Sequence, residues 1–106
     1  MRSNVVFCAI VLAGCSTTLG AAEGDFKRGR LPEAEDKLVA LEPRLPSWDE
    51  PQRVEYALYR GLVLHALGDR AQAVVWLRQA KDHAGLLRDD DRTRLQLALD
   101  AIGKAE

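Results

Sequence analysis

The sequence is short of the residues that most often carry chemistry. Its 106 residues include only two cysteines, Cys8 and Cys15, and only two histidines, His65 and His83. It contains no H-E-x-x-H or C-x-x-C segment, and its motifs supply no nucleophile with a base and an orienting acid. These absences argue against an enzyme, so we expect no catalytic residue, no metal site and no small-molecule substrate.

The sequence also has no excess of charge of one sign and no long apolar run. The chain has 15 basic and 16 acidic residues spread along its length, a near-balance that does not suggest nucleic-acid binding. The apolar run from Val5 to Ala13 is about nine residues, well below the ~20 that a membrane-spanning helix needs. Aromatic residues make up only 6% of the chain, so leucine, valine and alanine must build most of any core.

The first residues have the parts of an export signal. Arg2 supplies a positive start, the run from Val5 to Ala13 supplies an apolar segment, and small residues follow. The alternative interpretation is a buried strand or helix of a cytosolic domain. Both cysteines fall within this segment or directly after it, where a thiol can serve processing rather than a disulfide.

The segment Leu12-Ala13-Gly14-Cys15 resembles the lipobox of bacterial lipoproteins. This resemblance implies that a diacylglyceryl group is attached to Cys15 and that cleavage after Gly14 makes Cys15 the new N-terminus. Ser16 resembles the outer-membrane sorting signal of Gram-negative cells. Two or more acyl chains hold a protein firmly at a bilayer, where a single chain holds it only marginally. We therefore expect a signal peptide over residues 1–14 and a lipidated terminus with its tether over residues 15–20.

From residue 21 to 106 the pattern predicts one small all-α domain. Apolar residues recur at spacings of three and four, and no segment alternates cleanly at a period of two. Pro32 suits the first turn of a helix, and three aspartates from Asp89 to Asp91 suit the start of another. These aspartates lack the glycine and distal glutamate of a calcium loop. The expected helices cover about residues 19–27, 31–41, 51–67 and 71–84 and the segment that begins at 89.

Two residues compete to cap the helix that contains Pro51. Ser47, with Glu50 three residues later, has the form of a capping box, and Asp49 is the rival cap. The prolines at positions 43 and 46 are expected to break the chain before this helix.

Small residues recur with a spacing that indicates an internal repeat. One series, with spacings of seven, five and seven residues, is Gly61, Gly68, Ala73 and Ala80. The same spacing occurs thirty-nine residues earlier in Ala22, Gly29, Ala34 and Leu41. Small side chains at such points let two antiparallel helices approach closely, and the glycine in the middle allows the turn. The sequence therefore predicts two similar helical hairpins.

The segment Tyr56 to Ala80 resembles the tetratricopeptide repeat, a 34-residue helix–turn–helix. Over roughly residues 20 to 104 the resemblance implies two hairpins and a C-terminal capping helix. The offset of thirty-nine residues departs from the family, and the extra residues fit between Pro43 and Pro51. One hairpin cannot bury its own apolar face, so this array is near the minimum size for such a fold.

Repeats of this family act by recognition, and the first helix of each pair lines a concave groove. In the second hairpin the resemblance implies a partner-binding groove formed by Glu55, Leu58, Tyr59, Leu62 and His65. This mixture of apolar and polar side chains suits an extended peptide or a helix of a protein partner. The alternative is that Leu58 and Leu62 pack on the capping helix or on the first hairpin.

Together, the two resemblances imply a lipid-anchored adaptor on the periplasmic face of the outer membrane. Small tetratricopeptide lipoproteins resemble assembly or piloting factors of secretion systems and pili, and type VI secretion is one such machine. The expected partner is therefore a protein of the envelope. We expect no cofactor, only the covalent lipid on Cys15. Two alternatives stay open: a structural envelope lipoprotein without a specific partner, and a small hydrolase.

Overall fold

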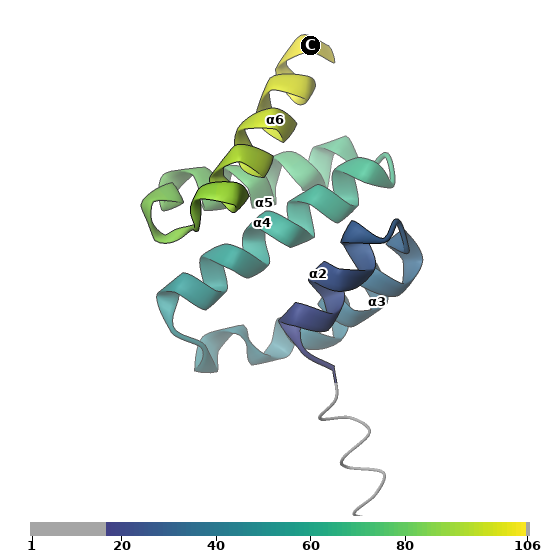
Figure 1. Ribbon diagram of the computed structural model, residues 1–106, viewed down its shortest axis with the longest axis vertical. Helices are drawn as coiled ribbons and strands as arrows, with labels where there is room; N and C mark the ends of the chain where they lie inside the picture. Colours follow the sequence, from purple (N-terminus) through teal and green to yellow (C-terminus); the bar gives the residue numbers. More distant parts are fainter. Residues whose placement is uncertain (1–16, 106) are drawn as a thin grey trace, which may run out of the picture.

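The computed structural model describes residues 17–105, which are helical over most of that range (Figure 1). The α-helices described there are α2 (Leu19–Lys27), α3 (Leu31–Leu41), α4 (Glu50–Ala66), α5 (Arg70–Asp82) and α6 (Asp89–Ala105). Two short 3-10 helices, η1 (Glu42–Ser47) and η2 (Ala84–Leu86), link them. Since no strand occurs in this range, the prediction of an all-α fold is confirmed. The predicted signal peptide and Cys15 lie outside the described residues.

Glycine turns connect the two closest helix pairs. Gly29 separates α2 from α3 with a φ of 79°, and Gly68 separates α4 from α5 with a φ of 92°. Both values lie in the left-handed region that glycine adopts without steric cost. Figure 1 shows α4 crossing the middle of the molecule, with α2 and α3 on one side and α5 and α6 on the other. The central helix α4 therefore positions all the others.

Local hydrogen bonds decide where α4 begins. The Asp49 carboxylate accepts from the backbone N–H of Gln52 at 3.1 Å, so Asp49 is the cap. The capping box predicted at Ser47 is wrong, because the Ser47 hydroxyl donates instead to the Arg44 carbonyl oxygen at 2.7 Å. Pro43 and Pro46 do not break the chain into an extended loop, since both lie within η1.

The segment after α5 also differs from its prediction. The helix expected to reach Ala84 ends at Asp82, and Ala84 itself begins η2. The last helix begins at Asp89 as predicted, and its residues Leu95, Ala98 and Ile102 are buried. Among the described helices, none combines the length and the apolar character that crossing a bilayer requires.

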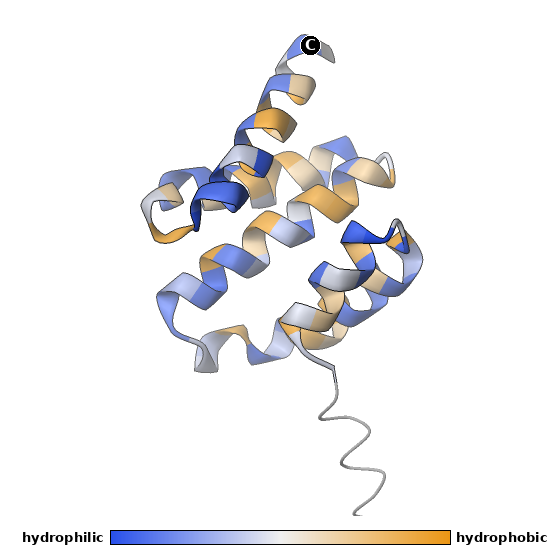
Figure 2. Ribbon diagram, viewed as in Figure 1, coloured by the Kyte–Doolittle hydropathy of each residue, from blue (hydrophilic) through white to orange (hydrophobic). Residues whose placement is uncertain are grey.

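Two clusters of buried hydrophobic residues form the core. The larger lies where α4, α5 and α6 meet, and the smaller where α2, α3 and α4 meet. Figure 2 shows hydrophobic residues gathered in the C-terminal half of α4, which contributes to both clusters. In the smaller cluster the Tyr56 hydroxyl donates to the Leu38 carbonyl oxygen at 2.6 Å. Burial raises the pKa of Tyr56 to about 12, so this hydroxyl stays a donor at neutral pH.

Candidate partner-binding groove

A hollow of about 320 Å³ opens between α2, α4 and α6. It is lined by Phe26, Leu62, His65, Arg94, Leu97, Ala98 and Ala101. Leu97 is 64% exposed, more than any other large hydrophobic residue in the described range. A concave surface that is mostly apolar, with a few polar groups at its edge, is the usual form of a binding site. We call this surface the α2–α4–α6 hollow.

The structure separates the five residues predicted to form the groove. Leu62 and His65 line the hollow, and Glu55 is half-buried on the same helix. Leu58 and Tyr59 are both 0% exposed, so they offer no surface to a partner in this arrangement. Leu58 belongs to the core cluster that includes residues of α6, which is the packing alternative that the sequence left open.

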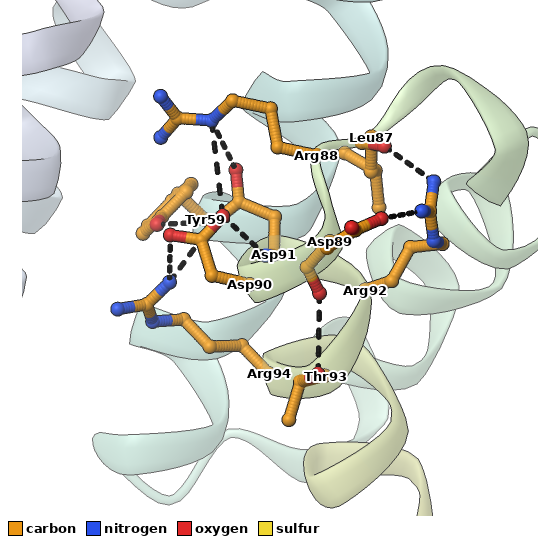
Figure 3. A network of polar contacts seen from close by, with 9 residues as sticks. All are labelled: Tyr59, Leu87, Arg88, Asp89, Asp90, Asp91, Arg92, Thr93 and Arg94. Atoms are coloured by element: carbon orange, nitrogen blue, oxygen red, sulfur yellow. Dashed lines mark hydrogen bonds and ion pairs between the residues drawn. The ribbon is translucent and has the colours of Figure 1, made fainter.

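A polar network fixes α6 against α4 beside the hollow (Figure 3). The Tyr59 hydroxyl donates to Asp91 Oδ1 at 2.7 Å, and Arg94 Nη1 approaches the same oxygen at 3.2 Å. Arg94 also donates to Asp90 Oδ2 at 3.1 Å, which holds the pKa of Asp90 below its usual range. Arg88 Nε lies 3.9 Å from Asp91 Oδ2. Although Asp91 is only 1% exposed, its charge is therefore compensated from three sides.

This network also changes the acidity of the Tyr59 hydroxyl. Burial, followed by the hydrogen bond to Asp91, raises the pKa of Tyr59 well above its ordinary value. The phenol therefore stays protonated and keeps donating across the physiological range. The sequence predicted Asp91 as part of a helix start, which is correct, but gave no sign of this bond. Tyr59 and Asp91 are 32 residues apart, and no local pattern connects them.

Three contacts hold α2 in place on the other side of the hollow. The Phe26 ring packs edge-to-face on Tyr59 with the ring centroids 5.9 Å apart, and Lys27 Nζ lies 5.9 Å from the Tyr59 centroid. Asp25 forms an ion pair with Lys37 of α3, and this hydrogen bond lowers the pKa of Asp25. These contacts fix the α2 wall of the hollow against α3 and α4.

A pair of carboxyl groups lies deeper between α2 and α4. Glu23 is only 6% exposed, and its Oε2 finds no hydrogen-bond partner among the described residues. Burial, followed by the hydrogen bond with the Glu55 carboxyl, raises the pKa of Glu23 to about 8. Nearby Asp91 also favours the protonated form, while Lys27 opposes it. Near neutral pH the Glu23 carboxyl is therefore mostly protonated, as burial and a close second carboxyl both favour.

A second hollow, of about 230 Å³, lies between η1, α4 and α5. Its lining includes the apolar residues Val54 and Trp76, but charged and amide side chains such as Arg53, Gln79 and Asp82 line it as well. The α2–α4–α6 hollow has only His65 and Arg94 as polar lining residues, so it is the better candidate for an apolar partner surface.

Comparison of the chain with protein-family models, with curated proteins and with solved structures found no match. Within residues 17–105, no group of three or more histidine, cysteine, aspartate or glutamate side chains is placed to hold a metal ion. The chemistry of the hollow must therefore be read from its own side chains, which are an apolar wall with one histidine and one arginine.

Proposed function

We propose that the protein is a lipid-anchored adaptor that binds an amphipathic helix of an envelope protein in the α2–α4–α6 hollow. The observation that carries this proposal is the position of Leu97, which is 64% exposed beside Leu62 and Phe26. A helix-in-groove partner would insert its apolar residues here and cover the exposed leucine. Removing that apolar surface from water is the main driving force for such binding.

The helix arrangement supports this choice of partner. In the described range α2 forms a hairpin with α3 and α4 forms one with α5, whereas α6 packs on α4 and α5 without a following helix to complete a third hairpin. The side of α6 that carries Leu97 and Ala101 therefore stays exposed. A helix supplied by a partner would cover this side as the second helix of each pair covers the first.

We infer a tetratricopeptide-like stack from the close approach within the pairs. Ala34, Ala73 and Ala80 are each 0% exposed, and the backbone at Gly61 lies directly against Leu77. These are four of the small residues whose spacing indicated the repeat. Proteins of this fold class act by holding other proteins, which favours an adaptor over an enzyme.

For the location, we propose that lipid on Cys15 holds the domain at the periplasmic face of the outer membrane. Because α2 begins at Leu19, four residues after Cys15, a fully extended link would span only about 14 Å. The hollow would then meet partners that lie close to the membrane, such as components of a secretion system or a pilus, with type VI secretion as one example.

The anchor is tested with Cys15→Ala in the producing cell. We expect the unchanged protein to fractionate with membranes and Cys15→Ala to move to the soluble fraction, because its acylation site is gone. Ser47→Ala serves as the control, since it removes a similarly small polar atom from an exposed position. Retention of Cys15→Ala in the membrane would reject the lipid anchor.

The hollow is tested by placing a photo-crosslinking residue at position 97. A second version carries it at position 75, where Val75 is 57% exposed on α5 and lies outside the hollow. We expect position 97 to capture a discrete envelope protein that position 75 does not, and Leu97→Glu to abolish co-purification of that protein. Equal capture of abundant envelope proteins at both positions would favour the structural alternative.

A further inference from the structure

Glu23, which pairs with Glu55, differs from the other buried acidic side chains of the described range, Asp25 and Asp91, in having no cation at ion-pair distance. Asp25 is paired with Lys37, and both Asp90 and Asp91 are paired with arginines of α6 or the residue before it. By contrast, none of the described basic groups lies at ion-pair distance from Glu23 or Glu55. A buried carboxyl with one oxygen unsatisfied is costly, and a donor from outside would remove that cost.

The pair lies along the same face as the hollow. Glu23 precedes Phe26 by one helical turn on α2, and Glu55 precedes Leu62 by two turns on α4. At about 1.5 Å of rise per residue, these separations are about 5 Å and about 10 Å along the two helices. Consider a partner helix whose apolar residues fill the hollow. Its residues one to two turns further along would then lie beside the acid pair.

From this geometry we infer that Glu23 and Glu55 form a binding site for an arginine side chain of the partner that occupies the α2–α4–α6 hollow. The inference rests on the proposed function, because it assigns a second contact to the same partner. A guanidinium presents several N–H donors in a planar fork, so it can serve the Glu23 Oε2 and the Glu55 carboxyl at once. A lysine ammonium reaches the same groups only as a point charge.

The exchange is balanced in protons and charge. In the free protein the Glu23 carboxyl is mostly protonated at neutral pH, since its pKa is about 8. When the guanidinium enters, this proton leaves to solvent and both carboxylates accept N–H hydrogen bonds. The charged groups that face the pair are Lys27 on α2 and Asp91 on α6, and neither lies at hydrogen-bonding distance from Glu23.

The experiment follows the Glu23 side-chain carboxyl by carbon-13 NMR in the intact protein, purified in detergent. The probe is N-acetylarginine amide, and its uncharged analogue N-acetylcitrulline amide is the matched control. We expect roughly millimolar binding of the arginine probe, as for a ligand of this size. The apparent pKa of Glu23 should fall by about one or more at saturation, because a nearby cation favours the ionised carboxyl. The citrulline probe should leave it unchanged.

Two variants complete the test. Glu23→Gln should lose the response of the Glu55 carboxyl to the arginine probe, while Glu33→Gln, at an exposed position on α3 with the same change in net charge, should keep it. An identical response to both probes, or no response of Glu23 to either, would overturn the inference. The proposed function is judged separately by crosslinking at position 97, so a partner captured there without an arginine response would reject only the acid-pair site.

Discussion

Gly61 lets α4 lie directly on α5, and its replacement tests whether this close approach holds the second hairpin together. In Gly61→Ala the new Cβ would lie 2.6 Å from both Cγ and Cδ2 of Leu77 and 3.2 Å from the carbonyl oxygen of Ala73. Leu77 is 0% exposed, so its Cγ cannot move away without disturbing the core. Overpacking of this kind costs about 1–3 kcal/mol, against a gain of about 1 kcal/mol in helix propensity. We expect a net loss of about 0–2 kcal/mol, so that Gly61→Ala shows none of the gain in helix propensity.

The assay is urea unfolding followed by far-ultraviolet circular dichroism, which reports the free energy of unfolding. Gly103→Ala is the matched control, because Gly103 is also helical and a Cβ there meets nothing within 4 Å. It should be neutral or stabilising by up to about 1 kcal/mol. Leu77→Ala alone should cost about 2–5 kcal/mol through its cavity.

The double variant Gly61→Ala/Leu77→Ala tests whether contact with Leu77 causes the loss of stability in Gly61→Ala. In Gly61→Ala/Leu77→Ala the added methyl group enters the space that Leu77 vacated, so the double variant should lose at least about 1 kcal/mol less than the sum of the single losses. If Gly61→Ala stabilises the protein by about 1 kcal/mol, the full gain in helix propensity, or if the two losses simply add, the inferred contact between Gly61 and Leu77 does not limit the packing of α4 on α5.

Two further predictions concern the polar groups beside the hollow. Tyr59→Phe removes the hydroxyl that donates to buried Asp91 and should lower the free energy of unfolding by about 1–3 kcal/mol in urea; a loss below about 0.5 kcal/mol would show that this bond does not fix α6. The raised pKa of Glu23 means that its contribution to stability is fully present below the unfolded value of 4.5 and is lost as pH rises through about 8. At about 1.4 kcal/mol per pKa unit the loss is at most about 5 kcal/mol, and because a buried site relaxes around a new charge we expect about 1–3 kcal/mol. Glu23→Gln lacks this loss, so its stability relative to the unchanged protein should rise by that amount between about pH 5 and pH 9 in thermal or urea unfolding. Parallel pH profiles for the two proteins would contradict it.

The sequence alone was sufficient for the helices and most of their ends, because these depend on neighbouring residues. The helices predicted at 19–27 and 31–41 are α2 and α3, and the last helix begins at Asp89 as expected. Glycine at position 68 and aspartate at position 69 act within a few residues of themselves, as a turn and a cap. The wrong cap at Ser47 also has a local cause. The two candidate caps are two residues apart, and the Ser47 hydroxyl bonds to Arg44 within η1 while Asp49 caps α4.

Tertiary structure decided which residues of a helix face remain available. Helical periodicity correctly placed Leu58 and Leu62 on one side of α4, but only the packing of α6 showed that Leu58 is covered while Leu62 lines a hollow. The bond from Tyr59 to Asp91 and the pairing of Glu23 with Glu55 join groups 32 residues apart in both cases. A periodic pattern states the direction in which a side chain points; what lies opposite depends on how distant helices cross, and that is set by the close packing of the whole core.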